Sequence, residues 1–159
     1  MAVAAPHPRS LRHATGRTDR GTADGSVIGA FFEVYNTLGF GFLEHVYVLA
    51  LERELVARGH RVAREVSVPV VYKGETIAWQ RLDMLVDERL VAETKATYTL
   101  PPTATRQLHN YLHATRYRVG LLLHFGPEPK FHRAVRFGDR ARPVAAGGTD
   151  STDLSDPDG

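Results

Sequence analysis

The stretch that decides the fold is RLDMLVDERLVAETKA, residues 81–96. Two runs rich in Leu, Val and Ala flank the polar tripeptide at 87–89, a pattern that predicts two antiparallel strands joined by a tight turn. The apolar residues suggest that this hairpin is a central, buried part of a sheet. Asp83, Glu93 and Lys95 interrupt it, and charged side chains are rarely buried without a partner or a purpose. These three residues are therefore the first candidates for a functional site.

The length of the hairpin loop decides whether these charges meet. Residues two apart on a strand share a face, so Glu93 and Lys95 point the same way. A two-residue loop would place Asp83 opposite Ala92 and turn it away from Glu93, whereas a three-residue loop places Asp83 opposite Glu93. In the second case two carboxylates and an amine converge. The repulsion between two adjacent carboxylates is relieved by a hard divalent cation such as magnesium, which prefers carboxylate oxygen.

Periodicity on both sides of this hairpin predicts an α/β protein with a mixed sheet flanked by helices. The first two expected helices cover residues 26–38 and 43–58, with Leu43 in the buried stripe of the second. A third helix, capped by Thr103 and ending near Thr115, should cross from the third strand to the fourth. The strands are expected at residues 66–72, 76–86, 90–96, 119–125 and 131–137, the fourth buried on both faces and the last at an edge.

The length of 159 residues suits one domain. Composition divides the chain into a disordered leader at 1–25, a folded domain at 26–137 and an acidic, disordered tail at 138–159. The leader carries four arginines but no apolar core of a secretory signal. No apolar run is long enough to span a bilayer. The absence of cysteine excludes disulfides, thiolate metal sites and a cysteine nucleophile, and it suits a cytoplasmic protein.

The charge distribution indicates the class of partner only weakly. The formal net charge is +2 at pH 7. Four aspartates and no basic residue lie in the segment from Pro143 onward, so the rest of the chain carries +6. A mildly basic body suits a phosphate-bearing partner such as nucleic acid.

Three further polar residues are placed to join the charged hairpin. Glu44 borders the apolar stripe of the second helix and can face the sheet, although an acid in a first turn also satisfies the helix dipole. Gln107 and Tyr111 lie four apart on the third helix and share a face, which is also the ordinary pattern of a half-buried helix.

These motifs together resemble the PD-(D/E)xK nuclease superfamily, and in particular a small bacterial family named for its GxxExxY motif. That motif reads here GFLEHVY at 41–47, and it is followed by RLDMLV at 81–86, VAETKA at 91–96 and QLHNYL at 107–112. The last is a QxxxY pattern similar to that of the RecB-like and phage exonuclease branch. Leu82 stands where the superfamily's name has proline. The resemblance covers residues 28–137 and implies a restriction-endonuclease-like αβββαβ core.

The resemblance also implies a mechanism and a set of roles. Asp83, Glu93 and the carbonyl of Thr94 would bind Mg2+ or Mn2+, and Glu44 would complete the shell or hold a second ion. Lys95 would orient the attacking water and stabilise the developing charge, with Gln107 positioning Lys95 or the nucleic-acid backbone. We expect nucleic-acid contacts from Tyr111, Arg81, Arg106 and Lys73.

The expected function is thus metal-dependent hydrolysis of phosphodiester bonds, in DNA rather than RNA. The alternative is a nuclease fold that binds nucleic acid or a protein partner without cleaving, although the intact Glu44, Asp83, Glu93 and Lys95 argue against it. The oligomeric state stays open, a dimer included.

Overall fold

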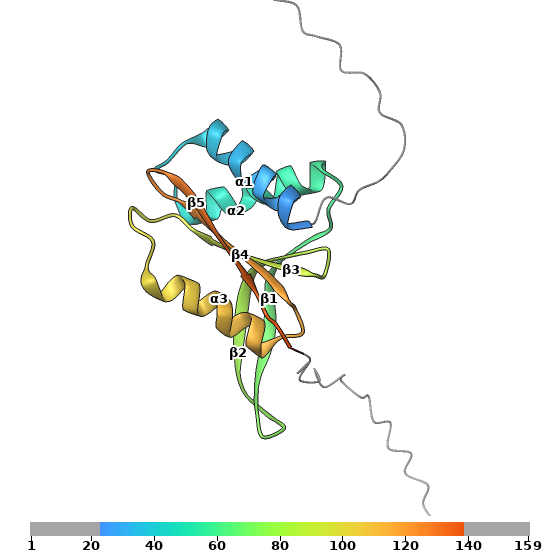
Figure 1. Ribbon diagram of the computed structural model, residues 1–159. Coiled ribbons are helices and arrows are strands. Elements are labelled where there is room, and N and C mark those ends of the chain that lie inside the picture. The colour runs from blue at the N-terminus through green and yellow to red at the C-terminus, as the bar shows by residue number, and fades with distance from the viewer. Residues whose placement is uncertain (1–22, 139–159) are drawn as a thin grey trace, which may run out of the picture.

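A five-stranded mixed sheet forms the centre of the protein in a computed structural model, which describes residues 23–138 (Figure 1). The expected leader and tail lie almost wholly outside these residues. The elements are α1 (Ala23–Leu38), α2 (Glu44–Ala57), β1 (Val62–Tyr72), β2 (Glu75–Val86), β3 (Leu90–Lys95), α3 (Pro102–Ala114), β4 (Val119–Phe125) and β5 (Pro129–Val135). Their order and the α/β class confirm the prediction.

The strands lie in sequence order across the sheet, β1-β2-β3-β4-β5. Neighbouring strands are antiparallel except β3 and β4, which are parallel and are joined through the crossover helix α3. β5 lies at an edge, and Gly120 to Phe125 of β4 are buried, as the continuous apolar run predicts.

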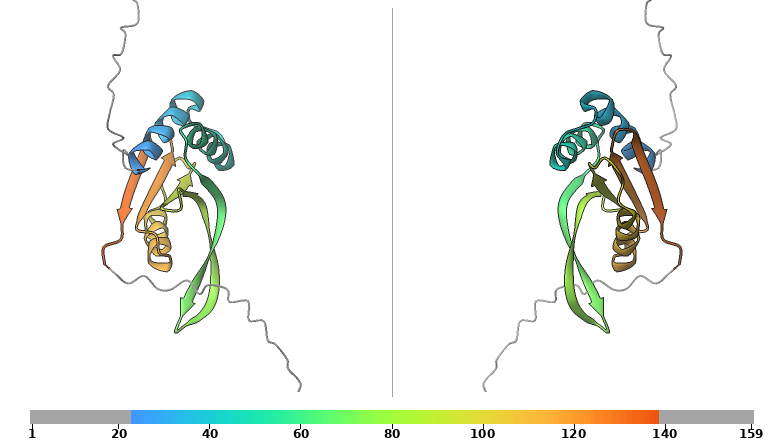
Figure 2. Two further views of the ribbon diagram at one scale, coloured as in Figure 1. Left: turned by 90° about the vertical axis from the view of Figure 1, so that its right-hand side faces the viewer. Right: turned by 90° about the vertical axis from the view of Figure 1, so that its left-hand side faces the viewer.

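Helices lie on both sides of the sheet (Figure 2), and each face of the sheet carries its own cluster of buried apolar side chains. Helices α1 and α2 pack on the face that presents Met84, Ala92 and Leu121. Helix α3 packs on the face that presents Leu85, Val91 and Leu122. Val91 precedes Glu93 by two residues on β3, so the alternation of side chains directs Glu93 toward the α3 side.

The loop between β2 and β3 contains three residues, because Val86 pairs with Leu90. Asp87 in this loop is held from outside: its carboxylate lies 2.7 Å from Nδ1 of His60 and accepts a hydrogen bond from the amide of Arg61 at 2.9 Å. His60 Nε2 in turn lies 2.7 Å from Ser26 Oγ on α1. Burial alone would raise the pKa of Asp87, but the bonds to His60 and Arg61 outweigh it and lower that pKa. The loop that sets the register is thus anchored to other parts of the fold.

The hairpin of β1 and β2 extends well beyond the rest of the sheet and past the end of α3 (Figure 2). β2 pairs with β1 along almost all its length but with β3 only from Met84 to Val86. β2 therefore separates from β3 at Asp83 while it stays paired with β1, which leaves a gap in the ladder between β2 and β3.

Several local expectations differ from the structure. Helix α1 begins at Ala23, inside the expected leader of residues 1–25, and β5 covers Pro129–Val135 rather than residues 131–137. Helix α2 begins at Glu44, and Leu43 is the residue before it, 72% exposed rather than in the buried stripe. Helix α3 begins at Pro102 after Pro101, with no side-chain cap from Thr103. Proline suits a first helical turn because that turn's amides have no partner inside the helix. β1 begins at Val62, four residues earlier than expected.

Candidate active site

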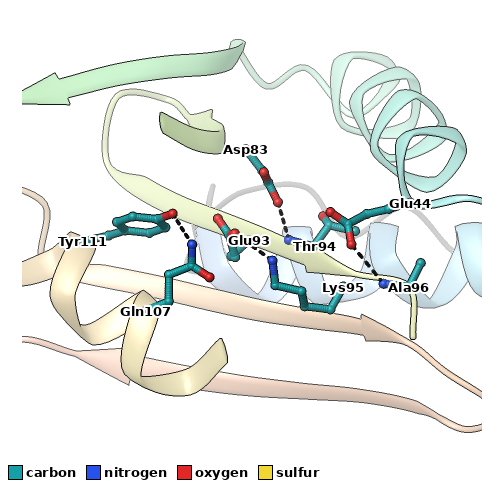
Figure 3. Close-up of polar contacts among 8 residues, drawn as sticks. All are labelled: Glu44, Asp83, Glu93, Thr94, Lys95, Ala96, Gln107 and Tyr111. Carbon is teal, nitrogen blue, oxygen red and sulfur yellow. Dashed lines mark hydrogen bonds and ion pairs between the residues drawn. The ribbon is translucent and has the colours of Figure 1, made fainter. Parts of the chain in front are cut away.

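Asp83 occupies the gap between β2 and β3. Ladder pairing of these strands ends at Met84 with Ala92, so Asp83 and Glu93 follow as the next opposed residues. Instead of a backbone carbonyl, Oδ2 of Asp83 accepts the hydrogen bond from the Thr94 amide, at 2.9 Å (Figure 3). The aspartate is thereby fixed beside the buried centre of β3, in the register that a three-residue loop requires.

Glu93 is the most unusual group of the site. Its side chain is buried, with the residue only 2% exposed, and Oε2 has no hydrogen-bond partner among the described residues. Burial, reinforced by the negative charge of Asp83, raises the pKa of Glu93 from 4.5 to about 7, against the opposing effect of Lys95. A buried carboxylate oxygen without a donor is costly, and it is the kind of ligand that a hard cation prefers.

Lys95 lies beside Glu93 on the same face of β3. Its Nζ donates to Oε1 of Glu93 at 3.2 Å. Burial would lower the pKa of Lys95, but the negative charges of Glu93, Glu44 and Asp83 outweigh that effect and raise it. The amine is therefore held in its protonated form, able to donate hydrogen bonds and unable to act as a base near neutral pH.

Glu44 reaches the site from the first turn of α2. Its Oε2 accepts a hydrogen bond from the amide of Ala96 at 3.3 Å, just beyond the end of β3 (Figure 3). The turn before α2 depends on glycine, because Gly41 has φ of +120°, a conformation that side-chain-bearing residues rarely adopt. The conformation at Gly41 leads the chain into α2, where Glu44 then faces the end of β3.

Gln107 and Tyr111 face β3 from α3, on the opposite side of the sheet from α1 and α2 (Figure 3). Nε2 of Gln107 donates a hydrogen bond to the hydroxyl of Tyr111. Burial and the charges of Glu93 and Asp83 raise the pKa of Tyr111, so its hydroxyl keeps its proton. The two residues form a neutral polar wall next to the acidic pair.

The other expected nucleic-acid contacts lie away from this cluster. Arg81 projects from β2 with an exposed side chain, 3.6 Å from Glu65. Lys73 lies at the tip of the β1–β2 hairpin, with Nζ 5.5 Å from the centre of the Tyr72 ring. Arg106 is exposed on α3, next to Gln107. The three cations are thus spread over the hairpin and α3 rather than gathered in the site.

The donor set of the site suits a hard divalent ion, because Asp83 and Glu93 supply carboxylates and one oxygen of Glu93 is unsatisfied. Over residues 23–138, however, no three Asp, Glu or His side chains are grouped closely enough to form a ready metal site. Glu44 is engaged by Ala96, and Glu93 by Lys95. An ion held by the carboxylates of Asp83 and Glu93 would therefore take its remaining ligands from backbone carbonyls and water.

His124 is a neighbour of the site that sequence reasoning missed. It pairs with Lys95 across the parallel ladder of β3 and β4 and is buried. Its Nε2 donates to the carbonyl of Thr97 at 2.7 Å, whereas Nδ1 has no partner in the described chain. The signal was present, since one histidine interrupts the apolar run VGLLLHF at 119–125.

Comparison with known proteins places the chain in a family. No curated protein and no solved structure shows significant similarity to it. Among the described helices, none is long and apolar enough to cross a membrane. The family model of the PD-(D/E)XK nuclease superfamily matches residues 22–136, which include every element of the fold. With its five-stranded mixed sheet between helices, the chain belongs to the PD-(D/E)XK nuclease superfamily.

Proposed function

We propose that the protein is a metal-dependent nuclease of the GxxExxY type that hydrolyses phosphodiester bonds, in DNA rather than RNA. The observation that carries this proposal is the buried carboxylate of Glu93, whose Oε2 lacks a partner beside Asp83 and Lys95. A superfamily member that had lost its activity would have little reason to retain so costly a group.

Asp83 and Glu93 would hold Mg2+ or Mn2+, helped by the carbonyl of Thr94, and Glu44 would complete the shell or hold a second ion. A divalent ion in such a site polarises the scissile phosphate and lowers the pKa of a bound water. The bond from the Thr94 amide fixes the orientation of Asp83 before any ion arrives. Preorganisation of this kind reduces the rearrangement that the reaction requires.

Lys95 would act as a fixed cation and hydrogen-bond donor. The surrounding carboxylates keep its amine protonated. The amine can therefore orient the attacking water and offset negative charge that builds up on the phosphate. The Nζ of Lys95 donates to Oε1 of Glu93, and with that carboxylate engaged by a divalent ion the amine would be available to the substrate.

Gln107 and Tyr111 would border the path of the strand that is cut. Their hydrogen bond fixes both polar groups on the α3 side of β3. Gln107 would position Lys95 or the nucleic-acid backbone, and Tyr111 would contact the strand. Arg81, Arg106 and Lys73 would bind phosphates farther along, because they are exposed cations on the hairpin and on α3.

A cleavage assay with purified protein tests the proposal. Single-stranded and double-stranded DNA and RNA are incubated with the protein, in Mg2+, in Mn2+ or in chelator. We expect metal-dependent cleavage of DNA that the Glu93→Gln variant lacks. If the protein binds all four nucleic acids but cleaves none of them, it is instead a silent binding module on the nuclease fold.

A further inference from the structure

Exposed aromatic side chains lie beside the candidate active site. Phe40 and Phe42 are on the turn between α1 and α2, and Tyr98 is on the segment that follows β3. Phe40 is 44% exposed and Tyr98 is 77% exposed. The two rings form an edge-to-face pair, with centroids 6.2 Å apart and an interplanar angle of 66°. Large apolar groups at the surface of an ordered turn call for an explanation.

The backbones that carry Phe40 and Tyr98 are held by buried side chains. The hydroxyl of Tyr47, a fully buried residue, donates to the carbonyl of Gly39 at 2.6 Å and accepts from the amide of Phe42 at 3.2 Å. On the other segment, His124 donates to the carbonyl of Thr97 at 2.7 Å. The side chain of Tyr47 thus fixes the backbone on either side of Phe40, and that of His124 fixes the backbone next to Tyr98.

A hydrogen bond ties the aromatic pair to the acidic site. Glu44 lies four residues after Phe40, and it accepts from the amide of Ala96, two residues before Tyr98. Two residues span at most about 7 Å. The backbone of Tyr98 therefore lies near Ala96, the residue at the end of β3 that Glu44 accepts from, and Phe40 lies there because its ring packs on that of Tyr98.

We propose, on the basis of the proposed function, that Phe40 and Tyr98 form a stacking platform for an unpaired nucleobase next to the phosphate that is cut. An edge-to-face contact covers at most one face of one of the two rings, and Tyr98 is 77% exposed. Nucleobases stack on exposed aromatic faces without regard to sequence. The neighbouring site, under the proposed function, binds the phosphate that is cut. The base and the phosphate of one nucleotide would therefore be bound side by side.

This placement selects a class of substrate. In a continuous duplex each base is covered above and below by its neighbours, and the grooves show only base edges. A base reaches an aromatic face only if it is unpaired or turned out of the stack. The substrate class that this placement favours is therefore single-stranded nucleic acid or a single-stranded end, because in the interior of a duplex a base must first be unpaired and unstacked.

The test measures binding separately from cleavage. The full chain carries Lys95→Ala to prevent cutting, and Ca2+ replaces Mg2+. Fluorescence anisotropy then gives the affinity for a labelled single-stranded DNA and for the same sequence as a blunt-ended duplex. The variants are Phe40→Leu and Tyr98→Leu, which keep an apolar side chain but remove the ring, and Tyr98→Phe, which keeps the ring.

We expect each leucine variant to weaken single-strand binding by about tenfold or more. Tyr98→Phe should restore wild-type affinity, and duplex affinity should change by less than about twofold in every variant. The matched control is Phe131→Leu on the edge strand β5, where Phe131 is 43% exposed and packs edge-to-face on Phe32. This control should leave both affinities unchanged. Thermal unfolding verifies that each variant is folded.

Other outcomes overturn the proposal. Unchanged single-strand affinity, or an equal loss for both substrates, excludes a stacking role. If the leucine variants change only self-association in sedimentation, the aromatic pair is a protein contact instead. Failure of the proposed function would give a different result. If wild-type protein cuts nothing in Mn2+ but still binds single strands in a way that depends on the rings, the platform is supported and the nuclease is excluded. Metal-dependent cleavage that the leucine variants leave unchanged retains the nuclease and excludes the platform.

Discussion

Oδ2 of Asp83 accepts a hydrogen bond from the amide of Thr94 at 2.9 Å, at the point where β2 leaves β3. One carboxylate thus has two roles: it replaces a missing ladder bond, and it places negative charge next to Glu93. The two roles can be separated, because asparagine keeps an acceptor of the same shape without the charge.

Asp83→Asn should therefore lose the response to metal while keeping the stability of the metal-free protein close to wild type. Asp83→Ala should lose both, since it leaves the Thr94 amide without its acceptor, at a cost of roughly 1–3 kcal/mol. The measurement is the melting temperature in chelator and in Mn2+. A melting temperature of Asp83→Asn that still rises with Mn2+ would show that Asp83 is not a ligand.

Lys95→Ala should abolish cleavage, with a loss of about a hundredfold or more, while metal binding largely remains. The reason is that Lys95 donates from beside the carboxylates and contributes no oxygen to the ion. Initial rates on labelled DNA and calorimetric titration with Mn2+ measure the two effects. Lys130→Ala, on the exposed edge strand β5, is the matched control. Full cleavage by Lys95→Ala would remove this amine from the mechanism.

The buried Glu93 should make the stability of the metal-free protein fall as pH rises. Its pKa is about 7 in the folded chain, against an ordinary value of 4.5. Between these values the folded protein keeps a proton that the unfolded chain has lost, so its free energy of unfolding decreases with increasing pH and levels off above the folded pKa. Other groups titrate too, and the readout is therefore a difference between variants.

Urea unfolding in chelator at pH 5, 6, 7 and 8 measures this effect. The Glu93→Gln variant cannot ionise, so it should gain stability relative to wild type as pH rises from 5 to 8. For Glu75→Gln, at the exposed start of β2, the free energy of unfolding should change with pH as it does in wild type. If the free energy of unfolding of Glu93→Gln also changes with pH as in wild type, burial does not hold the proton on Glu93.

Tyr47→Phe should destabilise the protein by roughly 1–3 kcal/mol, because it removes two hydrogen bonds while keeping the ring stacked on Phe125. The missing hydroxyl releases the turn around Gly39 and Phe42. Urea unfolding measures the loss, and hydrogen exchange of the Phe42 amide locates it. Tyr72→Phe, exposed at the end of β1, is the control. Equal unfolding midpoints for Tyr47→Phe and wild type would contradict this role.

The element order and the acidic hairpin could be predicted from the sequence, because they follow from local patterns. Alternating and helical spacing of apolar residues located the strands and helices, and the polar tripeptide at 87–89 located the turn. The loop's register could not be chosen from the sequence, since its anchor, the contact of Asp87 with His60, joins positions that local spacing does not relate.

Long-range contacts also explain what was missed around the site. Leu43 looked like a core residue because helical spacing continued through it, whereas the glycines at 39 and 41 turn the chain so that it lies outside. His124 stands out in the sequence as the one polar residue of an apolar run, but the run does not show what it contacts. Its role depends on its neighbours across the sheet, Lys95 and the turn at Thr97, which only the parallel pairing of β3 and β4 brings together.

The three-residue loop at 87–89 has a consequence for how chains of this kind can diverge. Surface loops between strands usually accept insertions and deletions. Here a single added or lost residue would reverse the facing of every side chain in β3, exchanging Glu93 for Thr94 at the acidic centre. Homologues that retain the chemistry should therefore keep the length of this turn and the anchoring carboxylate at its first position, whereas the exposed residues at 88 and 89 can vary.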